Sequence, residues 1–235
     1  MITVCSSFST DKILNEKGKI ISIQKGGPAL YLTNVFRKEN VLFKLISGPS
    51  VKVEILLTKK GEIGRVRKIP KPKKTNFEKI KTHFLLISTI YKEFDLSGIF
   101  KFQGKIFLDI QGYVRDIKKF GKKKQWKPSK EIISSLFCLK GTKEELKYIP
   151  RDMMKKQKKK CLIITKGRSG SIIYYKNKKF VFKPAKIVKV HNTIGVGDTF
   201  FANFVLSFIR TNGDIEIAGK TATNEAANFL TQHAK

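Results

Sequence analysis

The most informative segment of the chain is Asn192-Thr193-Ile194-Gly195-Val196-Gly197-Asp198-Thr199-Phe200. The residues that follow are mostly apolar as far as Arg210, and no Pro or Gly occurs before Gly213. This pattern predicts a buried helix from Asp198 to Arg210 with a glycine stop, beginning near Gly197. Two glycines let the backbone bend closely around an anion, and the first amides of a helix present free N–H groups to it.

The carboxylate of Asp198 at this turn has two interpretations. In the first, the amides of Gly195, Val196 and Gly197 stabilise charge that develops on a transferring phosphoryl group, and Asp198 accepts the proton of an attacking hydroxyl. In the second, Asp198 is an ordinary helix cap beside a plain glycine turn. Short glycine motifs match often by chance, so further motifs decide between the two.

The segment resembles the C-terminal signature D-T-x-G-A-G-D-x-F of the PfkB/ribokinase family of carbohydrate and nucleoside kinases. The chain departs from that signature at Asn192, where the family has Asp, and at Val196, where it has Ala. Asn192 removes a negative charge from any associated monovalent-cation site. The matching positions are Thr193, Gly195, Gly197, Asp198 and Phe200.

An apolar run ending in a glycine turn, 161–170, precedes two β-rich runs at 171–175 and 179–182. It resembles the family's T-x-G-x-x-G nucleotide segment, which implies that Thr165, Gly167 and Gly170 bind ATP. Taken alone, the pattern is more often that of a tight turn. Asp214 starts a last helix with apolar residues at helical spacing. The family has an Ala-rich helix beside the adenine pocket, which implies a place for Asn224 at the nucleotide; a simple core helix explains the spacing equally well.

The N-terminal region resembles the family's acceptor site. Residues 4–11 look like its first strand and loop, ending in the Asp that grips substrate hydroxyls, and Gly26-Gly27 precedes a helical stretch through Arg37. The resemblance implies that Asp11, Gly26 and Gly27 hold the acceptor. Tyr31 stands where the family commonly has Asn, and a solvated loop is the alternative for Asp11.

The middle of the chain supplies a metal candidate. Residues 136–146 resemble the strand leading to the family's N-x-x-E element, whose Glu positions hydrated magnesium. Glu144 is taken as the match, with Gly141 in place of Asn. The pattern Thr142-x-x-Glu145 could equally be a capping box without chemistry. Asp109, at the end of an apolar run, either orients phosphate-binding groups or caps the next helix.

Short continuous apolar runs are typical of strands buried on both faces, and they occur at 2–4, 84–87, 106–108, 136–139 and 161–164. Their alternation with helical or polar stretches predicts β-α-β units. The expected fold is α/β and ribokinase-like, with a mainly parallel central sheet flanked by helices and a small β lid. We expect one domain over 1–235, with lid strands from about 18–25 and 51–69, where apolar and charged residues alternate.

The net charge of +31 attracts polyanions, but the lysine runs are scattered along the chain and arginine is scarce. A solvated basic surface is therefore favoured over nucleic-acid binding. Cys5, Cys138 and Cys161 lie in or beside apolar runs without C-x-x-C spacing, which indicates buried thiols in a reducing compartment. Without a secretion signal or a bilayer-length apolar run, we expect a cytoplasmic protein with no membrane partner.

Two functions of different class follow. The first is a kinase that uses ATP and Mg²⁺ to phosphorylate an alcohol group of a sugar, polyol or nucleoside, with Asp198 as base. The second is a catalytically impaired, kinase-like protein that binds nucleotides or polyanions, suggested by Asn192, Gly141 and the high charge. The lid offers a surface for a homodimer.

Overall fold

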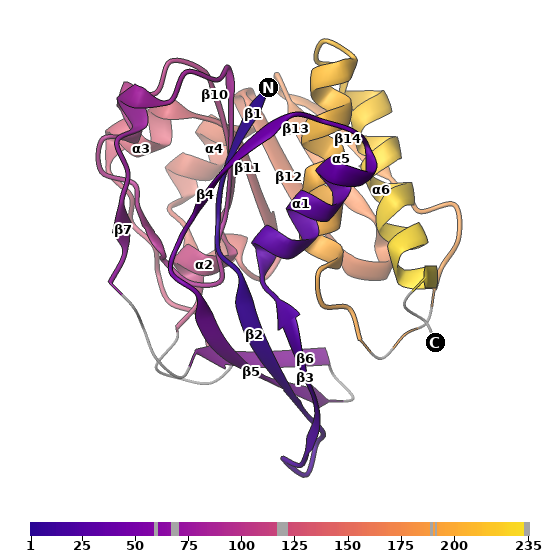
Figure 1. Cartoon of the computed structure of the whole chain (residues 1–235). Coiled ribbons are helices and arrows are strands. Elements are labelled where there is room, and N and C mark those ends of the chain that lie inside the picture. The colour runs from indigo at the N-terminus through magenta and orange to yellow at the C-terminus, as the bar shows by residue number, and fades with distance from the viewer. Residues whose placement is uncertain (59–60, 67–70, 117–121, 189, 191, 233–235) are drawn as a thin grey trace.

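The computed structural model describes residues 1–58, 61–66, 71–116, 122–188, 190 and 192–232 (Figure 1). Positions 59–60 and 67–69 of the expected lid range lie outside these residues. The main sheet has the strand order β14-β13-β12-β11-β10-β8-β1-β4. Its parallel strands are β1 (Ile2–Ser6), β4 (Phe43–Ser47), β8 (Phe84–Ser88), β10 (Lys105–Asp109), β11 (Leu136–Thr142) and β12 (Cys161–Thr165), and the antiparallel edge is β13 (Ser171–Tyr175) and β14 (Lys178–Phe182).

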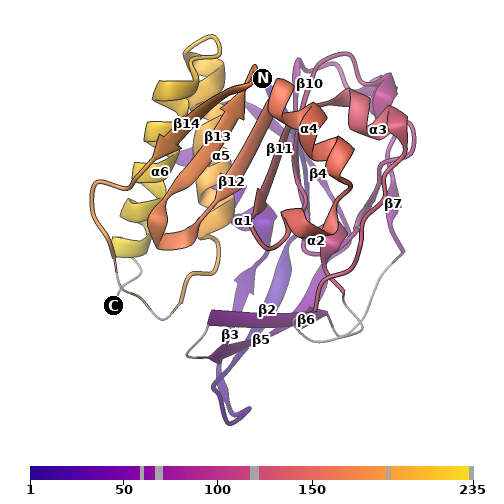
Figure 2. The ribbon, with the colours of Figure 1, turned by 180° about the vertical axis from the view of Figure 1, so that it is seen from behind.

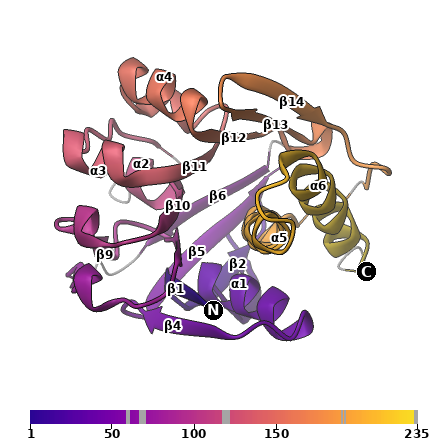
Figure 3. The ribbon, with the colours of Figure 1, turned by 90° about the horizontal axis from the view of Figure 1, so that it is seen from above.

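Helices cover both faces of this sheet (Figures 2 and 3). One face carries α1 (Pro28–Lys38), α5 (Val196–Arg210) and α6 (Ile215–Gln232); the other carries α2 (Gln111–Val114), α3 (Lys130–Ser135) and α4 (Arg151–Lys159). Successive strand residues alternate between the two cores, so that Val4 packs on the α5 side and Cys5 on the opposite side. The continuous apolar runs are thus buried on both faces, and the expected α/β architecture is confirmed.

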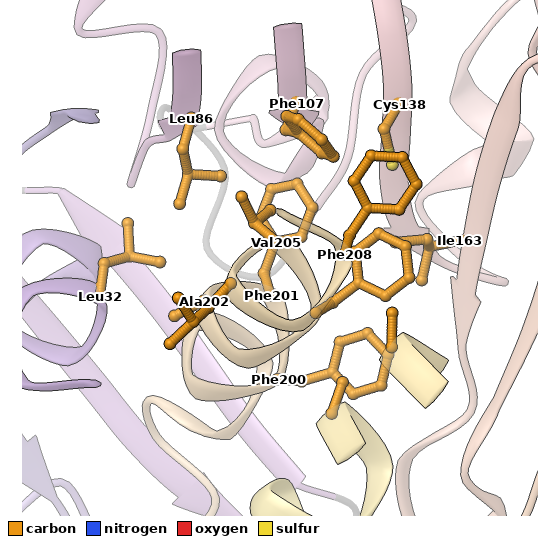
Figure 4. Packing of buried hydrophobic residues seen from close by; sticks show 14 of the residues in the cluster. Leu32, Leu86, Phe107, Cys138, Ile163, Phe200, Phe201, Ala202, Val205 and Phe208 are labelled. Carbon is orange, nitrogen blue, oxygen red and sulfur yellow. The ribbon is translucent and has the colours of Figure 1, made fainter. Parts of the chain in front are cut away.

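Helix α5 is buried almost all round, which explains why its sequence is apolar on every side. It packs between α1 and α6 and against the sheet (Figure 4). The ring of Phe208 lies 5.7 Å from Phe107 and 5.3 Å from Phe137, centroid to centroid. This packing fixes the first turn of α5, which begins at Val196, one residue before the predicted start near Gly197.

A second sheet lies beyond the carboxyl ends of the main strands (Figure 1), with the order β3 (Ile20–Gly26), β2 (Ser9–Leu14), β5 (Val51–Thr58) and β6 (Gly61–Val66). Its apolar residues, including Ile13 and Val53, form a core with Ile90 and Tyr91 from the segment after β8. Asp11 was expected at the end of a loop and instead lies inside β2. Only two residues separate β1 from β2, so the chain stays extended and pairs Asp11 with β3 and β5.

Strand β4 was not predicted, because its Lys44 is exposed and its apolar residues are only half-buried at the sheet edge. All three cysteines are buried free thiols, as expected. Among the helices that the structure describes, none combines the length and apolar character of a bilayer span. The remaining elements are β7 (Lys73–Lys74), β9 (Phe94–Asp95) and the 3₁₀ turns η1 (Phe77–Lys79), η2 (Ile99–Lys101), η3 (Leu146–Tyr148) and η4 (Gly167–Ser169).

Candidate active site

The first turn of α5 lies at the carboxyl edge of the main sheet. Gly195 caps the helix with a φ of 85°, and a Cβ there would stand 2.3 Å from the ring of Tyr31, so only glycine fits this cap. Asp198 is buried in the first turn, and its Oδ1 accepts a hydrogen bond of 2.9 Å from the hydroxyl of Ser88, the last residue of β8. Ligands of open α/β sheets bind at this edge, so Asp198 is well placed to meet one.

The environment of Asp198 suits a general base. Burial raises the pKa of its carboxyl group to about 6, with the positive charge of Lys140 and the hydrogen bond from Ser88 acting in the opposite direction. A carboxylate with this pKa is mostly ionised at neutral pH and yet close enough to that pH to accept a proton efficiently.

A buried ion pair stands beside Asp198. Lys140 of β11 donates to Asp109 at the end of β10, and both side chains are almost completely buried. Asp109 also accepts the backbone N–H of Gln111, the first residue of α2, at 3.1 Å. The N-cap position of that helix is Ile110. The Lys140 ammonium lies 5.5 Å from the ring centroid of Phe201 on α5. Lys140 was not among the predicted site residues, although a lysine at the end of an apolar strand is a signal that could have identified it.

A cavity of about 300 Å³ adjoins the start of α5. Thr165, Gly167 and Gly170, predicted to bind nucleotide, all line it together with Val196 and Gly197. Asn224 is not among the lining residues; its Oδ1 accepts the backbone N–H of Ala185 at 3.2 Å and holds that segment against α6. The apolar lining comes mainly from Ile187, Val188, Val190, Phe200, Ala226, Ala227 and Leu230.

The three predicted acceptor residues also come together. A Cβ on Gly26 would stand 1.9 Å from Oδ2 of Asp11, so this close approach requires glycine, and Gly27 precedes α1 with a φ of 87°. Burial raises the pKa of Asp11, while the Ser9 hydroxyl and the charge of Arg115 act against the rise. Arg115 also acts on the pKa of Asp198. It therefore lies within electrostatic reach of both carboxylates, which sequence reasoning did not anticipate.

Comparison with known proteins agrees with this arrangement. Residues 124–234 match the pfkB family of carbohydrate kinases. A pyrophosphate-dependent kinase in the ribokinase family, solved as a sulfate complex, superposes with a TM-score of 0.77 at 18% identity, over 98% of this chain and 95% of that one. The chain has the ribokinase fold.

Two further relatives support this assignment. The ribokinase of Thermotoga maritima superposes on the ribokinase-like chain with a TM-score of 0.67 at 19% identity, over 98% of this chain and 93% of that one. A nucleoside kinase of Methanocaldococcus jannaschii is 39% identical over 59 residues, which cover 25% of this chain and only 19% of that protein. The predicted resemblance to the PfkB/ribokinase family is confirmed.

The predicted metal-positioning residue Glu144 and its neighbour Glu145 have different surroundings in the ribokinase-like chain. Glu144 is exposed and forms an ion pair of 2.7 Å with Lys147, so the structure does not bring it to the buried cluster. Glu145 accepts the backbone N–H of Thr142 at 2.7 Å, and its own N–H donates to the Thr142 hydroxyl at 3.1 Å, which is the capping box considered above. The Glu145 carboxylate also interacts electrostatically with Lys140. Glu145, and not Glu144, is the carboxylate beside the cluster.

Proposed function

We propose that this chain transfers the terminal phosphoryl group of ATP to an alcohol group of a sugar, polyol or nucleoside. The observation that carries the proposal is the buried Asp198 at the start of α5, held by Ser88 at the carboxyl edge of the sheet. Burial gives this carboxyl group a pKa of about 6, as a base for an alcohol requires.

In the proposed reaction, Asp198 takes the proton of the acceptor hydroxyl as its oxygen bonds to phosphorus. The bond from phosphorus to the leaving oxygen breaks, and that oxygen keeps the electron pair. We assign the anion hole to the amides of Gly195, Val196 and Gly197, because the first N–H groups of a helix have no partner inside the helix and attract negative charge. The Val196 N–H donates to the Thr193 carbonyl at 3.2 Å, and it would exchange this bond for one to a phosphoryl oxygen.

The 300 Å³ cavity supports a nucleotide as the phosphoryl donor. Its glycine turn, Gly167 to Gly170, lies at one side and α6 at the other, with aliphatic side chains between. Pyrophosphate has no apolar part that would use such a lining, whereas a purine base does. We therefore propose ATP as donor, although a pyrophosphate-dependent kinase shares the fold.

The residues of the site fit Mg²⁺ that is held mainly by the donor. No group of three or more metal-ligating side chains occurs within the described part of the chain. Mg²⁺ in kinases is usually held by one or two carboxylates together with substrate phosphates and water, and Glu145 provides such a carboxylate beside the cluster. When bound, Mg²⁺ neutralises charge on the donor phosphates. We therefore assign the magnesium-positioning role to Glu145 in place of the predicted Glu144, which is exposed and paired with Lys147.

The acceptor is assigned to the space between Asp11 and Asp198. Asp11 can accept two hydrogen bonds from neighbouring hydroxyls, and the bare backbone of Gly26 and Gly27 allows a hydroxyl-rich ligand to approach closely. We propose that the second sheet acts as a lid over this space within a single domain. Two similar proteins are named a nucleoside kinase and a ribokinase, which supports an acceptor of this class.

The decisive experiment measures phosphoryl transfer from ATP, and separately from pyrophosphate, across a panel of pentoses, hexoses, inositols and nucleosides. We expect transfer from ATP to at least one acceptor and a loss of roughly 10²–10⁴-fold in Asp198→Asn. Asp214→Asn is the matched control, since it makes the same change at the start of α6. Near-normal turnover in Asp198→Asn would remove this residue from the mechanism. A wild-type protein that ATP stabilises but that transfers nothing would instead be the impaired kinase considered above.

We also propose that two copies of the chain meet through the lid. Strand β3 lies at one edge of the second sheet, and its Ile20, Ile21 and Ile23 are 49%, 57% and 65% exposed. An exposed apolar edge strand is a ready template for pairing with another chain. Light scattering should give a dimer for the wild type and a monomer for the double variant Ile21→Lys/Ile23→Lys; a wild-type monomer would contradict the proposal.

A further inference from the structure

The ammonium group of Lys140 occupies an unusual position. It lies at the start of α5, where the helix dipole is positive and the first amide N–H groups have no partner within the helix; the N–H of Val196 donates to the Thr193 carbonyl at 3.2 Å. A buried cation is costly in such a place unless an anion shares it. Asp109 pairs with Lys140 from one side, and the Asp198 carboxylate in the first turn of α5 acts on the same ammonium group. The partial positive charge of the helix start favours a bound anion in addition to these two carboxylates.

The space over Gly197 shows where a further anion would stand. The Nζ of Lys140 lies 3.4 Å from the point that a Cβ on Gly197 would occupy. Apart from Val196, Asp198 and the local helix backbone, no other atom of the described residues comes within 4 Å of that point. Gly197 also lines the cavity assigned to the donor. An oxygen bound by the amides of the α5 start would therefore meet Lys140 first.

We propose that Lys140 is a catalytic residue that contacts the transferring phosphoryl group opposite the α5 amides, and that Asp109 is the positioning residue that aims it. The inference rests on the proposed phosphotransferase function. Lys140 keeps its proton throughout: the acceptor proton goes to Asp198, and the ammonium supplies only charge and a hydrogen bond to a phosphoryl oxygen.

Two other roles make different predictions. If the Lys140–Asp109 pair only stabilises the fold, removing both charges together should be nearly neutral, because a buried ion pair can often be replaced as a unit but not by halves. If Lys140 acts only by lowering the pKa of Asp198, its loss should shift the pH profile, and full activity should return at higher pH.

The test compares Lys140→Met and the double variant Asp109→Asn/Lys140→Met with the wild type, using Lys143→Met as the control for loss of one positive charge, since Lys143 is exposed. We expect the high-pH plateau of kcat to fall roughly 10²–10³-fold in both Lys140 variants, as for loss of one anion-hole donor. The double variant, whose buried charges are both removed, serves if the single variant does not fold. Recovery of the plateau in the double variant, or of the single variant at high pH, would overturn the proposal.

A binding measurement separates this inference from the proposed function. The non-hydrolysable analogue adenylyl imidodiphosphate should raise the melting temperature of the wild type more than that of Lys140→Met, whereas adenosine, which lacks phosphates, should act equally on both. Equal stabilisation of the two proteins by the analogue counts against a phosphate contact at Lys140. A wild type without kinase activity that still shows the difference would refute the proposed function and leave the anion contact standing.

Discussion

The pH dependence of catalysis follows from the position of Asp198. Because the base must be ionised, kcat/KM should fall as the pH drops through the pKa of about 6 that burial gives this group. An exposed aspartate, with an ordinary pKa near 3.9, would keep activity constant over that range. At one pH unit below its pKa, roughly a tenth of the base remains ionised, so activity at pH 5 should be about tenfold below the plateau.

The substitution Ser88→Ala should raise the pH at which kcat/KM falls, which is the acidic limb of the pH profile. The hydroxyl of Ser88 donates to the ionised Asp198 at 2.9 Å, and a hydrogen bond to a charged group is worth about 1.5–3 kcal/mol. Since 1.36 kcal/mol corresponds to about one pKa unit, the limb should move up by about one to two pH units. The control is Ser47→Ala, the same change at the exposed end of β4.

The assay follows donor consumption directly by phosphorus NMR from pH 4.5 to 9, which avoids coupling enzymes with pH optima of their own. A limb at pH 4 in the wild type would refute the assignment of Asp198 as a buried base. An unchanged limb in Ser88→Ala would show that the hydrogen bond has no role in tuning it.

Three further substitutions test the geometry. Gly195→Ala should cost at least about 1–3 kcal/mol in urea unfolding, because its φ of 85° and the ring of Tyr31 both exclude a Cβ; an unchanged midpoint would contradict this. Gly26→Ala should raise the KM of the acceptor at least tenfold and leave that of ATP unchanged, since the new methyl group displaces the Asp11 carboxylate; equal effects on both substrates would count against an acceptor role. Phe208→Ala should cost about 3–5 kcal/mol in urea unfolding, because the ring is buried among other rings, and a loss below 1 kcal/mol would mean that the core collapses around the gap.

Local patterns were enough to predict the main sheet, except for its edge strand β4, and the α5 turn. Five apolar runs of three to four residues fell on strands β1, β8, β10, β11 and β12, because a strand buried on both faces needs apolar residues at every position. The glycine turn before α5 and the glycine turn after β12 were also readable, since each needs glycines at fixed spacing. Both turns line the same cavity.

Long-range pairing accounts for what sequence reasoning missed. In the sequence alone, Lys140 looks like the polar end of a strand. The register between β10 and β11 places Asp109 directly beside it, and the sequence does not show this pairing. Which of Glu144 and Glu145 lies near Lys140 depends on the side of the turn to which each side chain points. The capping hydrogen bonds with Thr142 hold Glu145, and a motif register that is one residue shorter selects the exposed Glu144 instead.

Scarce acids carry more functional information in this chain than its abundant lysines. The chain has 18 acidic and 49 basic residues. Burying a carboxylate costs its hydration free energy, so each buried acid needs a partner or a function that offsets this cost. Among side chains whose burial the structure describes, five acids are buried: Asp11, Glu54, Glu93, Asp109 and Asp198. Two have structural partners that account for them, since Glu54 pairs with Arg65 and Lys12, and Glu93 accepts the N–H groups of Ile90 and Tyr91.

The other three buried acids are those to which we assign roles in the proposed reaction. Asp109 pairs with Lys140, Asp198 lies in the first turn of α5, and Asp11 lies in β2 beside Gly26. Positive charge on the surface costs little free energy, because water and counterions screen it. The abundance of lysine therefore says little about a specific partner. Burying a carboxylate costs free energy of hydration, and such a group interacts only with the few groups placed around it. The physical cost of each group, more than its frequency, favours a small-molecule kinase over a polyanion-binding protein as the function of this fold.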